Sequence, residues 1–404
     1  MSPTTGAKLR LGLALLAAGP AVAIRLSGVD LSPLGAVAVF GSAVVATAFL
    51  LAWAAETAQL DISGSLATAV LAVIAVLPEY AVDLYFAFSA GHDPGRAQFA
   101  AANMTGSNRL LIGIGWPLVA IVAFAAWRRR GRGVRGRPSM ASVRLEPHRR
   151  VEVVFLAAAS AWAFVIVATG RIAWWSSVVL LALFGLYVWR LSRVPRSEPE
   201  LVGVPAALAG LSPGRRRAAV IGLFSVAALI VLGAAEPFAD GLVASGDRLG
   251  IDRFVLVQWV APLASEAPEL IVAALFAWRL RGGDALGTLL SSKVNQWTLL
   301  VGSIPLAYLA GGGGASFALD ARQSEEFLLT ATQALLALAV VLDLSFRRLE
   351  AVALLVLFLV QLPFPQTDVR LALAAVYTVA ALGLLVRQRR HIPLVARAAL
   401  AGVP

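Results

Sequence analysis

The sequence predicts an all-α polytopic membrane protein that consists of two inverted five-helix repeats with one extra helix at each end. The first observation is composition: 59% of the 404 residues are hydrophobic, only 14% are charged, and the mean hydropathy is +0.81. Soluble domains have about 45–50% apolar and about 25% charged residues. The second observation is a series of apolar segments near the roughly 20 residues that cross a bilayer as a helix. The third is a set of motifs that occurs twice in the same order.

About twelve transmembrane helices are predicted, one for each apolar segment. The segments are residues 9–26, 34–56, 64–90, 98–127, 151–170, 172–192, 218–245, 253–280, 285–310, 325–346, 349–364 and 369–386. The first is short, and with Lys8 and Arg10 at its start it also has features of a cleavable signal peptide. We favour a retained helix. Cleavage would leave the orientation of every later segment unchanged.

The positive charges predict the orientation in the membrane. Nine arginines lie within residues 128–150 and three more within 215–217, whereas loops of the opposite side carry scattered single arginines. Because cytoplasmic loops of membrane proteins are enriched in Lys and Arg, both termini are expected to be cytoplasmic, in a plasma or inner membrane. The lipid bilayer and this topology therefore account for the net charge of +11. No nucleic-acid partner is expected.

The motifs divide the chain into two repeats. Leu77-Pro78-Glu79 and a later Asn103-Met104-Thr105-Gly106-Ser107-Asn108 run match Ala267-Pro268-Glu269 and a later Gly287–Lys293 run. Five helices separate equivalent points, so the second copy enters the membrane from the opposite side, as in many secondary transporters. The predicted regions are an N-terminal helix (1–33), repeat 1 (34–192), a basic cytoplasmic linker (193–217), repeat 2 (218–364), and a C-terminal helix with a basic tail (365–404).

Glu79 and Glu269 are the main candidates for a site within the membrane. Each lies near the centre of an apolar segment, where a carboxylate costs a few kcal/mol and usually serves a function. Each follows a proline, which lacks an N–H and is predicted to break the helix and free backbone carbonyls. Carboxylates and carbonyls are ligands that Ca²⁺ prefers. The alternative, a protonated glutamate that only packs, is less consistent with two equivalent positions.

Nearby polar residues complete this candidate site and exclude other chemistries. The side chains that can add oxygen ligands or modulate the site are Asn103, Ser107, Asn108, Ser292 and Gln296. There is no cysteine, and the three histidines lie in loops or the tail, so hard cations with oxygen ligands are expected rather than a resident cofactor. No G-x-x-x-x-G-K-[ST] motif is present, which favours coupling to an ion gradient. No His-Glu-x-x-His or Gly-x-Ser-x-Gly pattern suggests an enzyme.

These motifs resemble those of the sodium/calcium exchanger (cation/Ca²⁺ antiporter) superfamily, with its repeated G-T-S-x-P-E and G-N-x-x-G-S-N-x-x-N patterns. The resemblance covers about 34–364. It implies that Glu79 and Glu269 coordinate transported Ca²⁺ with Asn103 and Asn108, and that the serines Ser107 and Ser292 contribute more weakly. The expected function is secondary-active antiport of Ca²⁺ or another divalent cation against H⁺. Na⁺-coupled Ca²⁺ exchange and a non-transporting relative are the alternatives.

The chain departs from the family pattern at positions that bear on transport. Where the family has Thr-Ser before x-Pro-Glu, the first repeat has Ala75 and Val76, which offer no side-chain oxygen, and the second has Ser265 and Glu266. Glu266 lies three residues before the motif glutamate, so both can share one helix face. A lysine, Lys293, stands where the family has an amide or acid.

Three interpretations of Lys293 remain open from the sequence. Its ammonium can replace a bound Na⁺ and leave proton-coupled exchange, because a buried lysine can exchange a proton near neutral pH. It can neutralise Glu266 or Glu269 in a site that still transports a cation. It can also lock the site as an inert ion pair. Asp83, one turn after Glu79, either joins this network or faces the lipid headgroups.

Overall fold

The computed structural model describes residues 3–61, 77–131, 142–193, 201–364 and 366–400. Within these ranges the regular structure is helical except for four strands of three residues each. Its helices of nine or more residues are α1 (Pro3–Ser27), α2 (Pro33–Ala58), α4 (Leu77–His92), α5 (Ala97–Leu110), α6 (Trp116–Gly131), α7 (Arg150–Thr169), α8 (Trp174–Leu191), α10 (Pro213–Leu249), α11 (Arg253–Trp278), α12 (Gly282–Asn295), α13 (Val301–Ala310), α14 (Ala321–Val341), α15 (Arg348–Gln361), α16 (Thr367–Arg387) and α17 (Ile392–Leu400). The short elements are α9 (Val204–Ala209), the 3₁₀ helices η1 (Pro94–Arg96), η3 (Pro147–Arg149) and η5 (Arg389–His391), and the strands β1 (Ser142–Arg144), β2 (Arg171–Ala173), β3 (Ser316–Ala318) and β4 (Ser345–Arg347).

The helices confirm the prediction of an integral, multi-pass membrane protein. Among the described residues, nine helical stretches are long and apolar enough to cross a bilayer. Most helix ends lie within a few residues of the predicted segments. The predicted segment 64–90 is seen only from residue 77 onward, as α4. Ala75 and Val76 lie outside the described residues.

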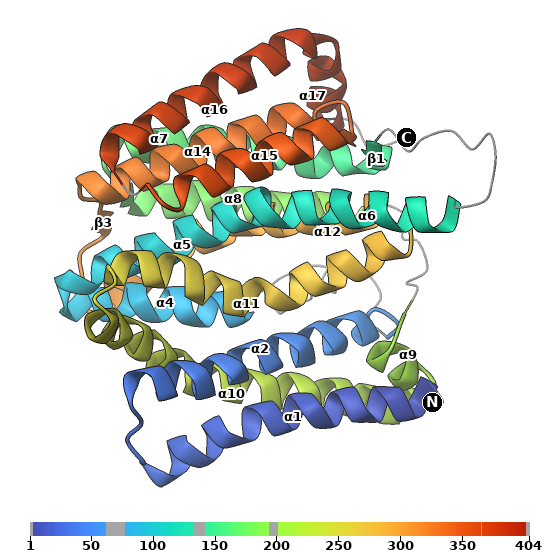
Figure 1. Ribbon diagram of the computed structural model, residues 1–404, viewed down its shortest axis with the longest axis vertical. Coiled ribbons are helices and arrows are strands. Elements are labelled where there is room, and N and C mark those ends of the chain that lie inside the picture. The colour runs from blue at the N-terminus through green and yellow to red at the C-terminus, as the bar shows by residue number, and fades with distance from the viewer. Residues whose placement is uncertain (1–2, 62–76, 132–141, 194–200, 365, 401–404) are drawn as a thin grey trace.

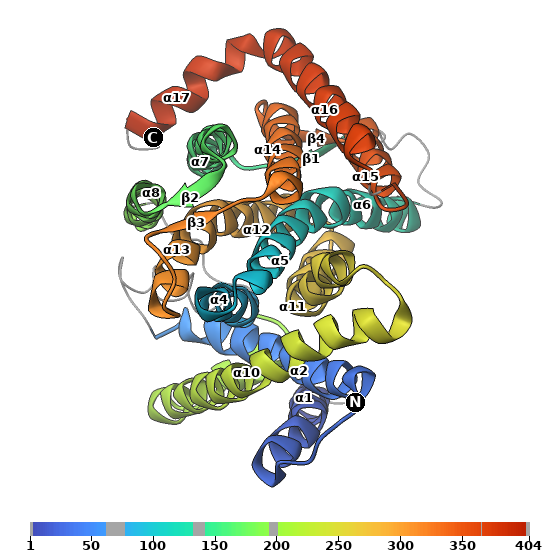
Figure 2. The same cartoon turned by 90° about the vertical axis from the view of Figure 1, so that its left-hand side faces the viewer.

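The helices run side by side in layers, and the motif helices occupy the middle (Figures 1 and 2). At one edge α10 packs on α1 and α2, and at the other α14 packs on α7 and α16. Between these edges α11 contacts α4, α5 and α12, and α4 contacts α5, as the end-on view shows. Both Pro-Glu motifs are therefore placed on helices in the interior of the bundle.

Two short antiparallel ladders join the halves of the chain. Strand β1 pairs with β4, and β2 pairs with β3. The ladders lie at opposite ends of the helices, with β1 and β3 on the right and left of Figure 1. The sequence did not predict these strands, because three residues are too few to show the alternating pattern of a half-buried strand.

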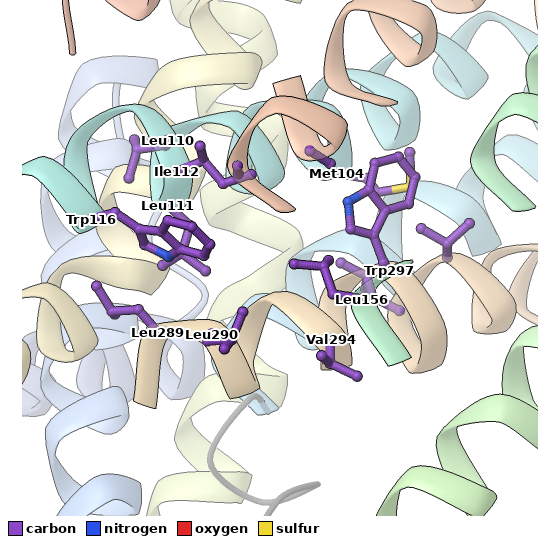
Figure 3. Close-up of a cluster of buried hydrophobic side chains, with 14 of the residues drawn as sticks. Met104, Leu110, Leu111, Ile112, Trp116, Leu156, Leu289, Leu290, Val294 and Trp297 are labelled. Carbon is purple, nitrogen blue, oxygen red and sulfur yellow. The ribbon is translucent and has the colours of Figure 1, made fainter. Parts of the chain in front are cut away.

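The two helices that carry the polar runs, α5 and α12, change from α-helical to π-helical winding at equivalent points, directly after their last residue. The 14-residue α5 continues through a π-helical turn, η2 (Leu111–Gly115), into α6, and the 14-residue α12 continues through η4 (Gln296–Leu300) into α13. Such π turns are rare and are frequent at functional sites. Apolar side chains fix them: Figure 3 shows Trp116 beside Leu289 and Leu290, and Trp297 near Met104.

The predicted break at the second Pro-Glu motif is wrong. Helix α11 continues through both Pro262 and Pro268. A proline inside a helix removes one backbone hydrogen bond, and neighbouring helices in a membrane protein can hold the remaining turns in place. Glu269 is therefore presented from a continuous helix, and Glu79 lies in the first described turn of α4.

An ion pair ties the end of α2 to the start of α10. Asp61 accepts hydrogen bonds from Arg216 Nε at 2.6 Å and Nη2 at 2.8 Å, and from Arg217 Nε at 3.1 Å. The hydrogen bond from Arg216, against partial desolvation of the carboxylate, lowers the pKa of Asp61 from 3.8 to about 2. A carboxylate with a lowered pKa stabilises the fold above its unfolded pKa, and this stabilisation is lost as the pH falls toward the folded value.

We therefore expect Asp61→Asn to lower the melting temperature of the detergent-solubilised protein at neutral pH. The difference in melting temperature from the wild type should be constant from about pH 8 to about pH 5 and should become smaller only below about pH 4. The matched control is Asp247→Asn, because Asp247 pairs with Arg253 and both side chains are half exposed. An equal melting temperature for Asp61→Asn and the wild type at pH 7 would contradict the prediction.

Candidate ion-binding site

One glutamine joins acids from the two halves of the chain. Gln296, at the start of η4, donates through Nε2 to Glu79 Oε1 at 3.1 Å and to Glu266 Oε1 at 2.5 Å. All three side chains are buried. One carboxylate of α4 and one of α11 therefore lie within hydrogen-bond distance of a single nitrogen atom.

The third acid is held one turn earlier on the same helix face. Ser292 Oγ donates to Glu269 Oε2 at 2.6 Å. Ser292 and Gln296 are four residues apart, so their side chains lie one above the other on α12 and η4. The Pro-Glu motifs of both halves thus converge on one turn of this helix. Glu79 and Glu269 are thereby bound by neighbouring side chains of the same helix.

Lys293 donates hydrogen bonds to both oxygens of Asn108, a predicted ligand of the cation. Its side chain is fully buried, and Nζ donates to the Asn108 carbonyl at 2.7 Å and to Asn108 Oδ1. Nζ also lies 5.3 Å from the ring centre of Trp297. Within the described part of the chain, the ammonium makes no ion pair with a carboxylate. The ammonium thus binds the same Asn108 side chain that was predicted to bind the cation.

Three other predicted residues have buried polar atoms that lack a hydrogen bond of good geometry. Both oxygens of Asp83, both polar atoms of the Asn103 amide and the Ser107 hydroxyl are buried without a hydrogen-bond partner among the described residues. Buried polar groups in native proteins are nearly always paired, so such atoms call for a water, an ion or a proton as partner. Asp83 therefore lies inside the bundle, on α4, and is not exposed.

Ser265 and Asn295 flank this cluster on α11 and α12. The Ser265 hydroxyl donates to the backbone carbonyls of Ala261 and Pro262, at 3.2 and 3.3 Å, so its hydrogen is used within α11. Asn295 was not singled out, yet its Oδ1 is buried without a partner and its carbonyl accepts from Tyr80 Oη at 3.2 Å. Its position next to Gln296 in a polar run was the available signal.

The oxygen atoms gathered here come from carboxylates, an amide and a hydroxyl. Among the described residues, no three His, Cys, Asp or Glu side chains are placed as a metal site. The three glutamates are instead spaced by the amide of Gln296 and the hydroxyl of Ser292. Amide, hydroxyl and carboxylate oxygens together form the kind of mixed set that binds Ca²⁺.

Close helix packing beside this cluster depends on Gly106. A Cβ at Gly106 would overlap the backbone carbonyl oxygen of Gln258 on α11. We expect Gly106→Ala to force α5 and α11 apart and to destabilise the protein by about 1–3 kcal/mol, the usual cost of overpacking. Thermal unfolding in detergent would measure this, with Gly383→Ala as control because a Cβ there meets nothing within 4 Å. An unchanged melting temperature for Gly106→Ala would show that the helices separate freely.

Comparison with known proteins gives a family and a fold. The sequence matches the family described as sodium/calcium exchanger protein over residues 32–193 and 219–365. No curated protein sequence matches the chain.

Several solved structures are similar. One, described as the crystal structure of the H⁺/Ca²⁺ exchanger CAX, is 42% identical, covers 98% of both chains and has a TM-score of 0.92. The Ca²⁺/H⁺ antiporter protein YfkE is 13% identical, with 92% of this chain and 99% of its own covered and a TM-score of 0.60. The sodium-calcium exchanger NCX_Mj, soaked with Na⁺ and Sr²⁺, is 19% identical, with 82% and 98% covered and a TM-score of 0.53. At these low identities, the similarity to YfkE and to NCX_Mj concerns the fold alone.

Proposed function

Because the chain belongs to the sodium/calcium exchanger family, and is thus a membrane cation/Ca²⁺ antiporter and not an enzyme, we propose that it exchanges Ca²⁺ for H⁺. The single observation that carries this proposal is the convergence of Glu79 with Glu266 and Glu269 on one turn of α12 and η4. The similarity to an H⁺/Ca²⁺ exchanger along nearly the whole chain supports this choice of ions.

The proposed architecture is two inverted five-helix repeats with an extra helix at each end, twelve spans in all. In chain order β1 corresponds to β3 and β2 to β4, so the observed pairs β1–β4 and β2–β3 exchange equivalent elements. Such reciprocal pairing is what a two-fold relation between two halves produces. The π turns η2 and η4, each after a 14-residue helix, support the same relation.

Both termini are proposed to be cytoplasmic. The start of α1 and helix α17 lie at the same end of the bundle, together with α9 and β1 (Figure 1). The end of α6 and the start of α10, whose described residues are rich in arginine, lie at this end as well, which the positive-inside rule assigns to the cytoplasm of a plasma or inner membrane.

The proposed mechanism uses three carboxylates and one amine. Glu79 and Glu269 bind the dehydrated cation together with oxygens of Asn103, Ser107, Asn108 and Ser292, and Asp83 and Ser265 lie at its margin. Protonation of Glu266, Glu269 or Lys293 then removes negative charge or adds positive charge, which lowers cation affinity. The two repeats rock against each other and expose the site to alternate sides.

Lys293 also supports a second candidate, a protein with this fold that does not transport. Its ammonium holds both oxygens of Asn108, which are expected ligands. An inert ion pair between Lys293 and a nearby glutamate is less well supported as the cause, because the ammonium forms no ion pair with a described carboxylate. We therefore favour the interpretation in which Lys293 takes the place of Na⁺ in a proton-coupled exchanger.

Flux into proteoliposomes tests the proposal. Purified protein is reconstituted, a pH gradient or an Na⁺ gradient is imposed, and uptake of ⁴⁵Ca²⁺ or Mn²⁺ is followed. Uptake driven by the pH gradient and insensitive to Na⁺ is expected. Uptake that requires Na⁺ would favour sodium coupling, and absent flux of several cations in folded protein would favour the non-transporting alternative.

A further inference from the structure

A second buried charged cluster adjoins the ion site, and neither the site nor the helix packing described above uses it. Arg109, next to Asn108 on α5, is almost fully buried and forms an ion pair with Glu326 of α14. Its Nη1 donates to Gln361 Oε1 of α15 at 3.1 Å, and its guanidinium lies 5.0 Å from the ring centre of Trp259. These contacts come from three other helices, α14, α15 and α11.

The cluster extends to the helix near the C-terminus. Arg370 of α16 pairs with Glu326 at 3.0 Å and with Glu325 at 3.7 Å, so two arginines meet two glutamates. Charges within a membrane are costly, face the protein interior and mark functional positions by default. Helix α16 lies beyond the residues that match the family, which end at 365. The chain thus places a charge of this outer helix in contact with the interior.

The backbone of α5 connects this cluster to the ion site. The carbonyl of Asn108 accepts from Lys293 of α12 at 2.7 Å, and the next carbonyl, that of Arg109, accepts from Gln333 Nε2 of α14 at 3.3 Å. Two residues later the helix adopts π winding at Leu111, where the backbone hydrogen bond moves from the fourth to the fifth residue. The Asn108–Arg109 unit is therefore held by different helices just where the winding changes.

We propose that Arg109 is a positioning residue: clamped by Glu326, and through it by Arg370, it fixes the α5 backbone so that Asn108 meets Lys293 at the cation site. This inference rests on the proposed function for its meaning in transport. The paired charges also matter, because an unpaired guanidinium beside Asn108 would repel a divalent cation.

The test removes both charges together. In Arg109→Gln/Glu326→Gln neither partner leaves an unpaired buried charge, and Arg370 keeps Glu325. We expect the KM for Ca²⁺ in proteoliposomes to rise about tenfold while kcat changes little, because a misplaced ligand weakens binding of the ion. The matched control is Arg347→Gln/Glu350→Gln, an ion pair of 2.8 Å at the end of the bundle, which should leave KM unchanged. An unchanged KM in the first variant would overturn the proposal.

A readout without flux separates this inference from the proposed function. Hydrogen exchange of the amides at 108–113, measured on the full-length protein in detergent, should be faster in Arg109→Gln/Glu326→Gln than in the control. If the wild type carries no divalent cation, the proposed function fails, and the exchange rates alone decide the positioning role. Equal exchange in variant and control would refute it.

A milder variant covers the case in which the double variant does not fold. Gln333→Leu removes the donor to the Arg109 carbonyl and leaves all four charges in place. We expect a rise in KM of about threefold, since only one hydrogen bond of ordinary strength is lost. An unchanged KM together with unchanged hydrogen exchange in Gln333→Leu would count against the clamp.

Discussion

Glu269→Gln is expected to abolish exchange of Ca²⁺ for H⁺ while the protein stays folded. The amide has the same size as the carboxylate, and its oxygen can still accept from Ser292 Oγ, so the helix packing is retained. It carries no charge, however, and the attraction of one carboxylate for a divalent cation amounts to several kcal/mol at a few ångströms. Uptake of ⁴⁵Ca²⁺ at a fixed concentration should fall on the order of 100-fold or more.

Glu79→Gln should have the same effect, because Gln296 can donate to the amide oxygen as it does to the carboxylate. Glu350→Gln is the matched control: Glu350 pairs with Arg347 at the end of the bundle and should be dispensable for flux. Size-exclusion profiles and melting temperatures of all three variants establish that the proteins are folded. Full uptake by Glu269→Gln would rule out this carboxylate as a ligand of the transported ion.

The helices could be predicted because long apolar runs have few alternatives in a membrane. Segment 151–170 became α7 (Arg150–Thr169), and segment 369–386 became α16 (Thr367–Arg387). The π turns η2 and η4 could not be predicted, since they depend on how α5 and α12 pack and leave no pattern in the sequence. The continuity of α11 through Pro268 likewise depends on neighbouring helices rather than on local propensity.

Part of the candidate site could be predicted because a charged residue in a membrane span, like a long apolar run, has few alternative explanations. Glu79 and Glu269 stand out because a carboxylate in an apolar run needs a function. The partner of Lys293 could not be predicted, because side-chain direction and helix rotation decide between Asn108 and a nearby acid. Arg109 could have been singled out by the same rule as the acids, since it also lies within a predicted span. Its partner Glu326 is more than 200 residues away in the chain, and only the fold brings the two together.

Lys293→Asn is expected to make Ca²⁺ transport dependent on Na⁺. The substitution removes a positive charge from the centre of the site and releases the carbonyl and side-chain oxygen of Asn108. It also adds an amide oxygen at the same position. The site then gains oxygen ligands and loses the fixed cation, so a monovalent cation can bind where the ammonium was. An imposed Na⁺ gradient should drive ⁴⁵Ca²⁺ uptake in this variant and have no effect on the wild type.

The matched control is Lys293→Met, which removes the same charge but adds no oxygen ligand. If Na⁺ dependence comes from the new ligand set, the methionine variant should lose proton-coupled exchange without gaining a response to Na⁺. If both variants respond to Na⁺ alike, charge removal alone accounts for it, and the oxygens of Asn108 suffice as the ligands. If Lys293→Asn transports Ca²⁺ against H⁺ like the wild type, the amine takes no part in coupling, and the protons must be carried by the glutamates alone.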